Sequence, residues 1–430
     1  MHDIARELNE QIKQENPHVY ELLSDLGRNL YYPKGILTQT DEAKEKAYRF
    51  NATIGMATEK GQPMFLSVIQ DTLSEYNPQD IYTYAPPAGK PKLRAIWREK
   101  ILKDNPSLQG KTFTLPIVTN ALTHGLSIAA DLFLNPDDTL VLPDKIWGNY
   151  TMIFGTRRDA KIKNFSFFAE DGRFNAQSMK EALLAQKEQG KAVLLLNFPN
   201  NPTGYTPVEQ EAQAIIDALL EVADQGINLV VIADDAYFGL FYEDSIKESL
   251  FGRIANIHPR ILAVKVDGPT KEEYVWGFRV GFITFADASS VVCECLENKA
   301  KAIIRGTISN ASHPAQTFVL HALESPDYEK QKQEKYMIME GRALKVKEIL
   351  KSGQYQELWD YYPFNSGYFM CLKLKGGVKA EQLRLHLLQE YGVGVIALGE
   401  SDIRVAFSCV EKEDLEELFE YIYRGTKDLA

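Results

Sequence analysis

Between about residue 110 and residue 285, short apolar runs alternate with longer segments whose apolar residues recur at helical spacing. The clearest unit starts with the apolar run 192–197, continues through a turn-rich loop, and reaches an amphipathic helix predicted over 208–225. A second apolar run follows at 228–233. Such uninterrupted runs are typical of parallel strands that helices cover on both faces. The pattern therefore predicts an α/β fold, a three-layer sandwich with a mostly parallel sheet.

End signals flank the helix predicted over 208–225. Thr206 is expected to cap its N-terminus, because a threonine oxygen can accept from the first free N–H groups. Pro207 suits the first turn, and Gly226 is expected to end the helix.

After Pro326 the pattern changes. Residues 327–352 are rich in charge, and their apolar residues fall on one helix face, which predicts a connecting helix. The chain beyond it mixes shorter elements, as α+β domains do. The expected elements are strands near 368–374 and 403–407 and helices over 380–391 and 412–424.

These changes divide the chain into three parts. We expect residues 51–325 to form the large α/β domain and residues 326–430 to form a smaller C-terminal α+β domain. Residues 1–50 carry no extended sheet pattern, so we expect them to join the small domain or a dimer interface.

Composition excludes several classes of protein. The 430 residues include 48 Lys and Arg against 59 Asp and Glu, a formal net charge of −11, and 45% are hydrophobic. This acidic balance argues against a nucleic-acid-binding protein. No apolar run approaches the roughly 20 residues that span a bilayer, and the polar N-terminus lacks a secretory signal core. We therefore expect a cytoplasmic protein with no membrane partner.

Cysteine and histidine usage indicates neither disulfides nor a bound metal. Four cysteines are too few and too scattered for a disulfide framework, so we expect reduced thiols. The seven histidines show no metal-ligand spacing.

Polar residues follow three successive apolar runs. The loop 197–204 follows the first, Asp234 and Tyr237 follow the second, and Lys271 follows the third, which covers 261–266. Each feature alone has a structural explanation: a turn, an ion pair or a solvated surface charge. Ligands of open α/β sheets, however, bind beyond the carboxyl ends of strands. Together these groups suit a cofactor with a pyridine nitrogen, a phenolic oxygen, an aldehyde and a phosphate.

With these motifs the chain resembles the fold-type I pyridoxal-phosphate enzymes of aminotransferase class I/II, most closely the aspartate and aromatic aminotransferase group. Residues 201–204 are similar to the family's NPTG loop, and residues 234–237 to its D-x-A-Y motif. Lys271 and Arg279 are spaced like its Schiff-base lysine and phosphate arginine. Further matches are Tyr84 with Gly89 and Leu93-Arg94, the turn 147–150, and Arg404.

The resemblance implies pyridoxal 5'-phosphate as the cofactor and suggests a role for each matching residue. Lys271 is expected to bond to the aldehyde and to move the proton at the substrate Cα. Asp234 is expected to keep the pyridine nitrogen protonated. Tyr237 and Asn201 are expected to hydrogen-bond the phenolic oxygen, and Trp147 to stack on the ring.

The resemblance also implies how the phosphate is held. The expected donors are Arg279, Thr270, the backbone of Ala121, Leu122 and Thr123 at a helix N-terminus, and Tyr84 from the neighbouring subunit of a shared-site homodimer. Two positions depart from the family's pattern: Gly268 replaces a hydroxyl residue, and Ala121-Leu122 replaces smaller residues of the phosphate turn. Asp267 has no role in this interpretation.

Two arginines are expected to select the substrate. Arg404 is expected to pair with the α-carboxylate, assisted by Asn201 and the backbone near Gly55. Arg305 precedes Ser309 at the interval seen in aspartate and aromatic aminotransferases, whose arginine reaches across the dimer to a distal carboxylate. A surface arginine at a helix end explains this short match equally well. The functional interpretation predicts aspartate, glutamate and 2-oxoglutarate as substrates, together with tyrosine and phenylalanine.

The leading hypothesis is a dimeric aminotransferase that moves an amino group from an L-amino acid to a 2-oxo acid by a ping-pong mechanism. One alternative is a β-lyase or decarboxylase, because the same cofactor labilises more than one bond at Cα. Another is a non-catalytic regulator on this fold, against which stand the acidic balance and the lack of a DNA-binding domain.

Overall fold

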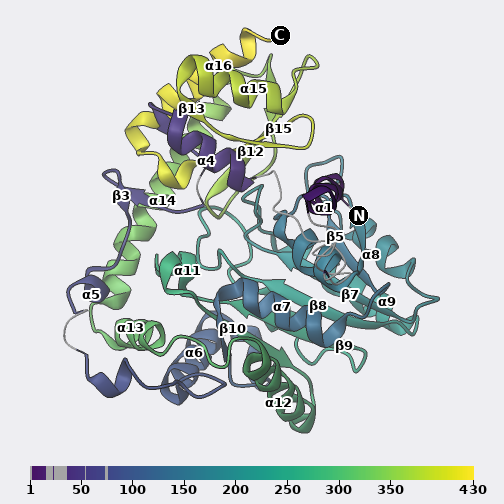
Figure 1. Cartoon of the computed structure of the whole chain (residues 1–430). Helices are drawn as coiled ribbons and strands as arrows, with labels where there is room; N and C mark the ends of the chain where they lie inside the picture. The colour runs from purple at the N-terminus through teal and green to yellow at the C-terminus, as the bar shows by residue number, and fades with distance from the viewer. Residues whose placement is uncertain (1, 16–22, 24–35, 54, 73–75) are drawn as a thin grey trace.

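The computed structural model describes residues 2–15, 23, 36–53, 55–72 and 76–430 (Figure 1). Its largest sheet has seven strands in the order β4-β10-β9-β8-β7-β5-β6. The strands are β4 (Ile117–Asn120), β5 (Thr139–Pro143), β6 (Lys161–Phe165), β7 (Lys191–Asn197), β8 (Asn228–Asp234), β9 (Ile261–Asp267) and β10 (Val280–Ala286). β10 runs antiparallel to both of its neighbours, β4 and β9, and the other strand pairs of this sheet are parallel. The predicted α/β class with a mostly parallel sheet is confirmed.

The register of the central strands places their polar ends side by side. In the parallel pair β7 and β8, Asn197 lies opposite Asp234, and in the pair β8 and β9, Asp234 lies opposite Val266. The apolar residues before these ends are buried in the core. Because carboxyl ends of parallel strands share one edge, the three polar loops emerge together.

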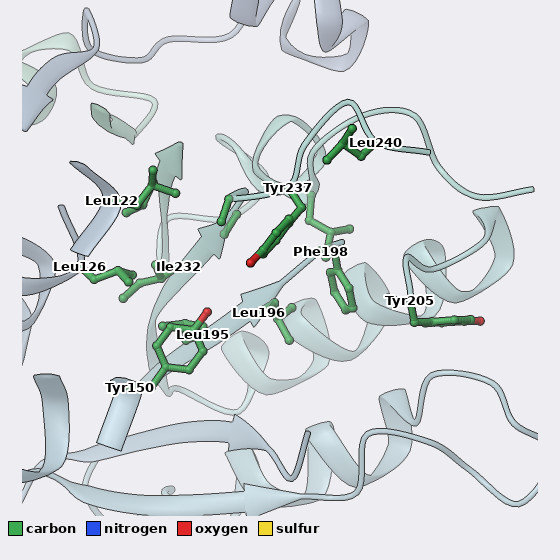
Figure 2. Packing of buried hydrophobic residues seen from close by; sticks show 14 of the residues in the cluster. Leu122, Leu126, Tyr150, Leu195, Leu196, Phe198, Tyr205, Ile232, Tyr237 and Leu240 are labelled. Atoms are coloured by element: carbon green, nitrogen blue, oxygen red, sulfur yellow. The ribbon is translucent and has the colours of Figure 1, made fainter. Parts of the chain in front are cut away.

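Helices flank this sheet. The helix α7 (Ala121–Phe133) packs against β9 and β10, and the helices α8 (Ala176–Leu184) and α9 (Glu209–Asp224) pack together. Figure 2 shows Leu122 and Leu126 of α7 near Ile232 of β8, within the same apolar cluster. The remaining helices here are α5 (Ser67–Gln70), α6 (Pro91–Asp104), α10 (Leu250–Ile254), α11 (Pro269–Glu272), α12 (Ser290–Thr307) and α13 (His313–Glu324).

The predicted cap of α9 is wrong. Thr206 exchanges a hydrogen bond with Ser366 at 2.7 Å and does not cap the helix, which begins at Glu209. Glu211 stabilises the helix start instead, because its carboxylate accepts from the N–H of Val208 at 2.7 Å. A glutamate in the first turn satisfies a free donor and interacts favourably with the helix dipole.

The C-terminal region has its own antiparallel sheet, in the order β11-β12-β15-β14. The long helix α14 (Tyr328–Lys351) precedes it, close to the predicted connecting helix. The strands are β11 (Trp359–Tyr361), β12 (Phe369–Leu374), β14 (Ile396–Leu398) and β15 (Asp402–Ala406), and the helices are α15 (Ala380–His386) and α16 (Leu415–Lys427). The short strands β11 and β14 were not predicted.

The N-terminal elements lie on both parts of the molecule (Figure 1). The helix α4 (Ile36–Lys46) packs on β14 and on the short strand β13 (Val393–Gly394), which pairs with β1 (Phe50–Asn51). The helix α1 (Asp3–Glu15) comes first, and β2 (Thr58–Glu59) and β3 (Gln62–Pro63) form a separate hairpin. Much of the predicted N-terminal segment, 16–22 and 24–35, lies outside the described residues. None of the described helices has the length and apolar character needed to cross a membrane.

Candidate active site

The loops after β7, β8 and β9 and the N-terminus of α7 line a cavity of about 230 Å³. All residues predicted for cofactor and substrate line this cavity, apart from Tyr84 and Arg305. Five further residues line it that the sequence did not single out: Tyr150, Asn197, Ala236, Trp276 and Phe369.

Asp234 ends β8 at the base of this cavity and is 2% exposed. Its Oδ2 accepts from the hydroxyl of Tyr150 at 2.6 Å, and its Oδ1 accepts from the N–H of Ala236 at 3.1 Å. Burial raises the pKa of this carboxyl to about 6, although the Tyr150 hydrogen bond opposes the shift. Tyr150 was missed as a partner, although it ends the turn 147–150 that contributed to the family resemblance. Figure 2 shows the hydroxyls of Tyr150 and Tyr237 pointing toward the same space.

Because Asp234 is buried, we expect the folding stability of the cofactor-free protein to depend on pH. Its pKa rises from 3.8 to about 6 on folding, so the folded state holds an extra proton between these values. The free energy of unfolding should therefore fall by about 2 kcal/mol as pH rises from about 4 to about 6. Denaturant titrations at several pH values measure this fall. Asp234→Asn should remove it and the exposed control Asp171→Asn should keep it; an unaltered profile in Asp234→Asn contradicts the expectation.

Lys271 lies in α11, with its amine over the ring of Tyr237. Its Nζ is 4.9 Å from the centroid of the Tyr237 ring, and its carbonyl accepts from the hydroxyl of Tyr368 at 2.9 Å. Burial among protein atoms lowers the pKa of the amine to about 8, against the opposing charge of Asp234. An amine with this pKa is partly neutral near pH 7, and the neutral form is the one that attacks a carbonyl.

Donors for an anion converge at one end of the cavity. The helix α7 begins at Ala121, and the guanidinium of Arg279 donates to the carbonyl of Trp276 at 3.1 Å. Thr270 Oγ is buried and has no hydrogen-bond partner in the part of the chain that the structure describes. Among the described residues, no carboxylate pairs with Arg279. An unpaired hydroxyl and a guanidinium with no carboxylate partner among the described residues, beside a helix N-terminus, fit a phosphate group.

Backbone packing explains Gly268, one of the departures from the family's pattern. A Cβ at Gly268 would lie 2.8 Å from the Cα of Gly281, and a Cβ at Gly281 would lie 2.5 Å from the carbonyl carbon of Ala121. Three backbone segments therefore touch at this point, and a serine at 268 has no room. Ala121 itself adopts φ +62°, a left-handed conformation that places the following N–H groups at the cavity.

Arg404 lies on β15 on the opposite side of the cavity and is 2% exposed. It donates to Asn201 Oδ1 at 3.0 Å and to the carbonyl of Thr53 at 2.8 Å, and its guanidinium lies 4.2 Å from the ring centroid of Phe369. Its Nε is buried without a partner. No carboxylate of the described residues pairs with it, and burial lowers its pKa. A buried cation of this kind suits a carboxylate ligand.

Tyr84 and Arg305 lie outside this cavity, on the surface. Tyr84 is 88% exposed. Arg305 lies in the last turn of α12, where it donates to Ser309 Oγ at 2.7 Å. It shares a shallow groove with Pro86 and Pro87, which follow Tyr84 closely in sequence. One chain therefore does not bring either residue to the cofactor residues.

Comparisons with known proteins agree with this architecture. The family model for aminotransferase class I and II matches residues 55–422. The aspartate aminotransferase of Bacillus sp. (strain YM-2) is 26% identical over 266 residues, which are 61% of this chain and 63% of that enzyme. A probable aspartate/prephenate aminotransferase of Aquifex aeolicus is 26% identical over 303 residues, 68% of this chain and 70% of that protein.

Solved structures support the fold. A crystal structure of an aminotransferase from Anaerococcus prevotii has a TM-score of 0.82 at 24% identity, covering 92% of this chain and 97% of that one. The kynurenine aminotransferase of Pyrococcus horikoshii has a TM-score of 0.79 at 17% identity, covering 95% of this chain and 98% of that one. Pyridoxal 5'-phosphate is the cofactor of the family, and the unpaired donors and the buried acid of the cavity fit it. The chain belongs to the class I and II aminotransferases.

Proposed function

We propose that the protein transfers the amino group of an L-amino acid to a 2-oxo acid by a ping-pong mechanism in this cavity, with aspartate, glutamate and aromatic amino acids as donors. The observation that carries the proposal is that one cavity is lined by the amine of Lys271, by a buried acid, Asp234, and by a buried arginine, Arg404, which pairs with no carboxylate of the described residues. An amine, an acid and a carboxylate receptor are the groups that transamination requires.

Each side chain has a distinct task in this proposal. Bound pyridoxal phosphate supplies an electron-withdrawing ring that stabilises negative charge at the substrate Cα. Asp234, held by Tyr150, ionises and keeps the ring nitrogen protonated. Lys271 forms the covalent bond with the aldehyde and later moves the proton to and from Cα. Tyr237 donates to the phenolic oxygen, and Trp147 covers one ring face.

The two ends of the cavity orient the reactants. At one end Thr270, Arg279 and the α7 N-terminus bind the phosphate. At the other end Arg404 binds the α-carboxylate, while Asn201, already hydrogen-bonded to Arg404, assists together with the backbone at Gly55. Fixing both ends aligns the Cα–H bond with the amine of Lys271.

The names of similar proteins support the proposed substrate range. Relatives carry the names aspartate and aspartate/prephenate aminotransferase, and one structural neighbour is a kynurenine aminotransferase. We propose a homodimer in which Tyr84 and Arg305 reach the partner's site. Both residues are exposed and lie near one groove, as residues of a shared interface should.

The Arg305 proposal makes a selective prediction. Arg305→Ala should lower kcat/KM for aspartate at least about tenfold more than for phenylalanine, because only aspartate loses a partner for its distal carboxylate. Steady-state kinetics with both donors measure the difference. Lys301→Ala, one turn earlier on α12 and in the same groove, is the matched control and should affect both donors alike. Equal losses of kcat/KM for the two donors in Arg305→Ala mean that Arg305 has no role in binding the distal carboxylate.

A half-reaction scan over the twenty common amino acids tests the proposed function. A transaminase converts its visible absorbance band to the amine form of the cofactor and releases one 2-oxo acid per site. A β-lyase would instead release ammonia with its oxo acid, and a decarboxylase would release carbon dioxide. Spectra left unchanged by aspartate, glutamate and tyrosine contradict the proposed substrates, and unchanged spectra with every amino acid favour a non-catalytic protein.

A further inference from the structure

Two glutamates follow Lys271 directly, and both are buried. Glu272 is 7% exposed and Glu273 is 2% exposed. Carboxylates are almost never buried so deeply unless they are paired. The roles proposed above use neither residue.

Lysines from two different helices hold this pair. Lys100 of α6 lies 3.0 Å from Glu272 Oε1, and Lys332 of α14 pairs with the same oxygen and lies 3.7 Å from Glu273 Oε1. Tyr328, one turn before Lys332, donates to Glu273 Oε1 at 2.6 Å. Burial disfavours the ionised form of Glu272, but the two lysines outweigh it and lower its pKa. Glu272 is therefore an anion bridged between α6 and α14.

The helix α14 links this cluster to the strand that carries Arg404. Figure 1 shows α14 extending from beside α13 to beside α16, and its ends contact both helices. Arg342, in the middle of α14, is fully buried and donates to the carbonyl of Ser408 at 2.5 Å. Ser408 follows β15 closely, and β15 contains Arg404. One helix thus contacts the segment after Lys271 and the segment after Arg404.

We propose that Lys332 is a positioning residue for Lys271. It acts by tying Glu272 and Glu273, the two residues that follow Lys271, to helix α14. The backbone of Lys271 is then held from two sides, by this ion pair and by the hydroxyl of Tyr368. The same helix sets the distance between the amine of Lys271 and the guanidinium of Arg404. A buried ion pair stabilises a fold less than apolar packing does, so we assign this pair a role in holding the Lys271 backbone in position. The proposal rests on the function proposed above for Lys271.

The rate of covalent cofactor capture tests the proposal apart from turnover. When pyridoxal phosphate is added to cofactor-free protein, the Lys271 nitrogen adds to the aldehyde carbon and the aldehyde oxygen leaves as water, which produces a visible band. Lys332→Met should slow this step by about tenfold or more, because a small displacement of the amine misaligns the attack. The Kd of pyridoxamine phosphate, which has no aldehyde, should change by less than about twofold, since its phosphate donors are untouched. Lys332→Arg should restore most of the capture rate.

Controls separate positioning from general damage. Lys335→Met removes the pair with Glu59 from the same helix, away from Glu272, and should capture the cofactor at the wild-type rate. Glu272→Gln breaks the same bridge from the other side and should also slow cofactor capture. It provides the test if Lys332→Met fails to fold. Wild-type capture rates in Lys332→Met or in Glu272→Gln overturn the proposal, as does an equal loss of pyridoxamine phosphate affinity. If the wild-type protein itself forms no band, the proposed function fails instead.

Discussion

Lys271→Ala should abolish transamination, with a fall in kcat of at least about 10⁴-fold, because the variant loses both the covalent link to the cofactor and the proton carrier. The cavity supports this size of effect, since no other lysine lines it among the described residues. Stopped-flow spectra of the half-reaction and steady-state rates measure the loss. The phosphate donors remain, so the variant should still bind pyridoxamine phosphate.

Chemical mapping provides the control for this prediction. Borohydride reduction of the wild-type holoprotein should fix the cofactor on the peptide that contains Lys271, and the same treatment of Lys271→Ala should leave no adduct. An adduct on a different lysine of the wild-type protein would falsify the assignment. Retained turnover in Lys271→Ala would contradict it independently.

Arg404→Met should lower kcat/KM for amino acids by about 10²- to 10⁴-fold, which corresponds to about 3–5 kcal/mol. The substrate carboxylate would enter a buried end of the cavity that has lost its guanidinium. Arg404→Lys should recover only part of the loss, because a lysine keeps the charge but not the paired donors. Single-turnover kinetics at a range of substrate concentrations separate binding from chemistry.

Two observations distinguish this role of Arg404 from a structural one. An amine donor without a carboxylate should react with Arg404→Met at nearly the wild-type rate. The melting temperature of the cofactor-free variant should stay the same or rise, since this guanidinium is buried and no carboxylate of the described residues pairs with it. Equal losses for both kinds of donor, or a large fall in melting temperature, contradict the proposed carboxylate site.

Local sequence pattern predicted the central sheet closely. The runs at 192–197, 228–233 and 261–266 correspond to β7, β8 and β9 within one residue at each end. These strands are buried on both faces, so nearly every position had to be apolar and the signal was strong. The polar residues that follow them were recognisable because they interrupt that signal.

Short elements with few buried positions were not predictable in this way. The strands β11 and β14 have three residues each, and several of these are only partly buried, so alternation could not identify them. Thr206 carried a typical capping signal but bonded to Ser366, about 160 residues away in the chain. A distant partner can override a local preference, and single-sequence patterns do not contain it.

By itself, the sequence determined the sheet, the chemistry at its strand ends and the resemblance to one family, because those features depend on residues close together in the chain. Only the tertiary structure decided which groups meet. It placed Tyr150 against Asp234, brought Arg404 to Asn201, and set Glu272 between Lys100 and Lys332. Each contact joins segments at least 60 residues apart, and its energy exists only after the core has closed around it.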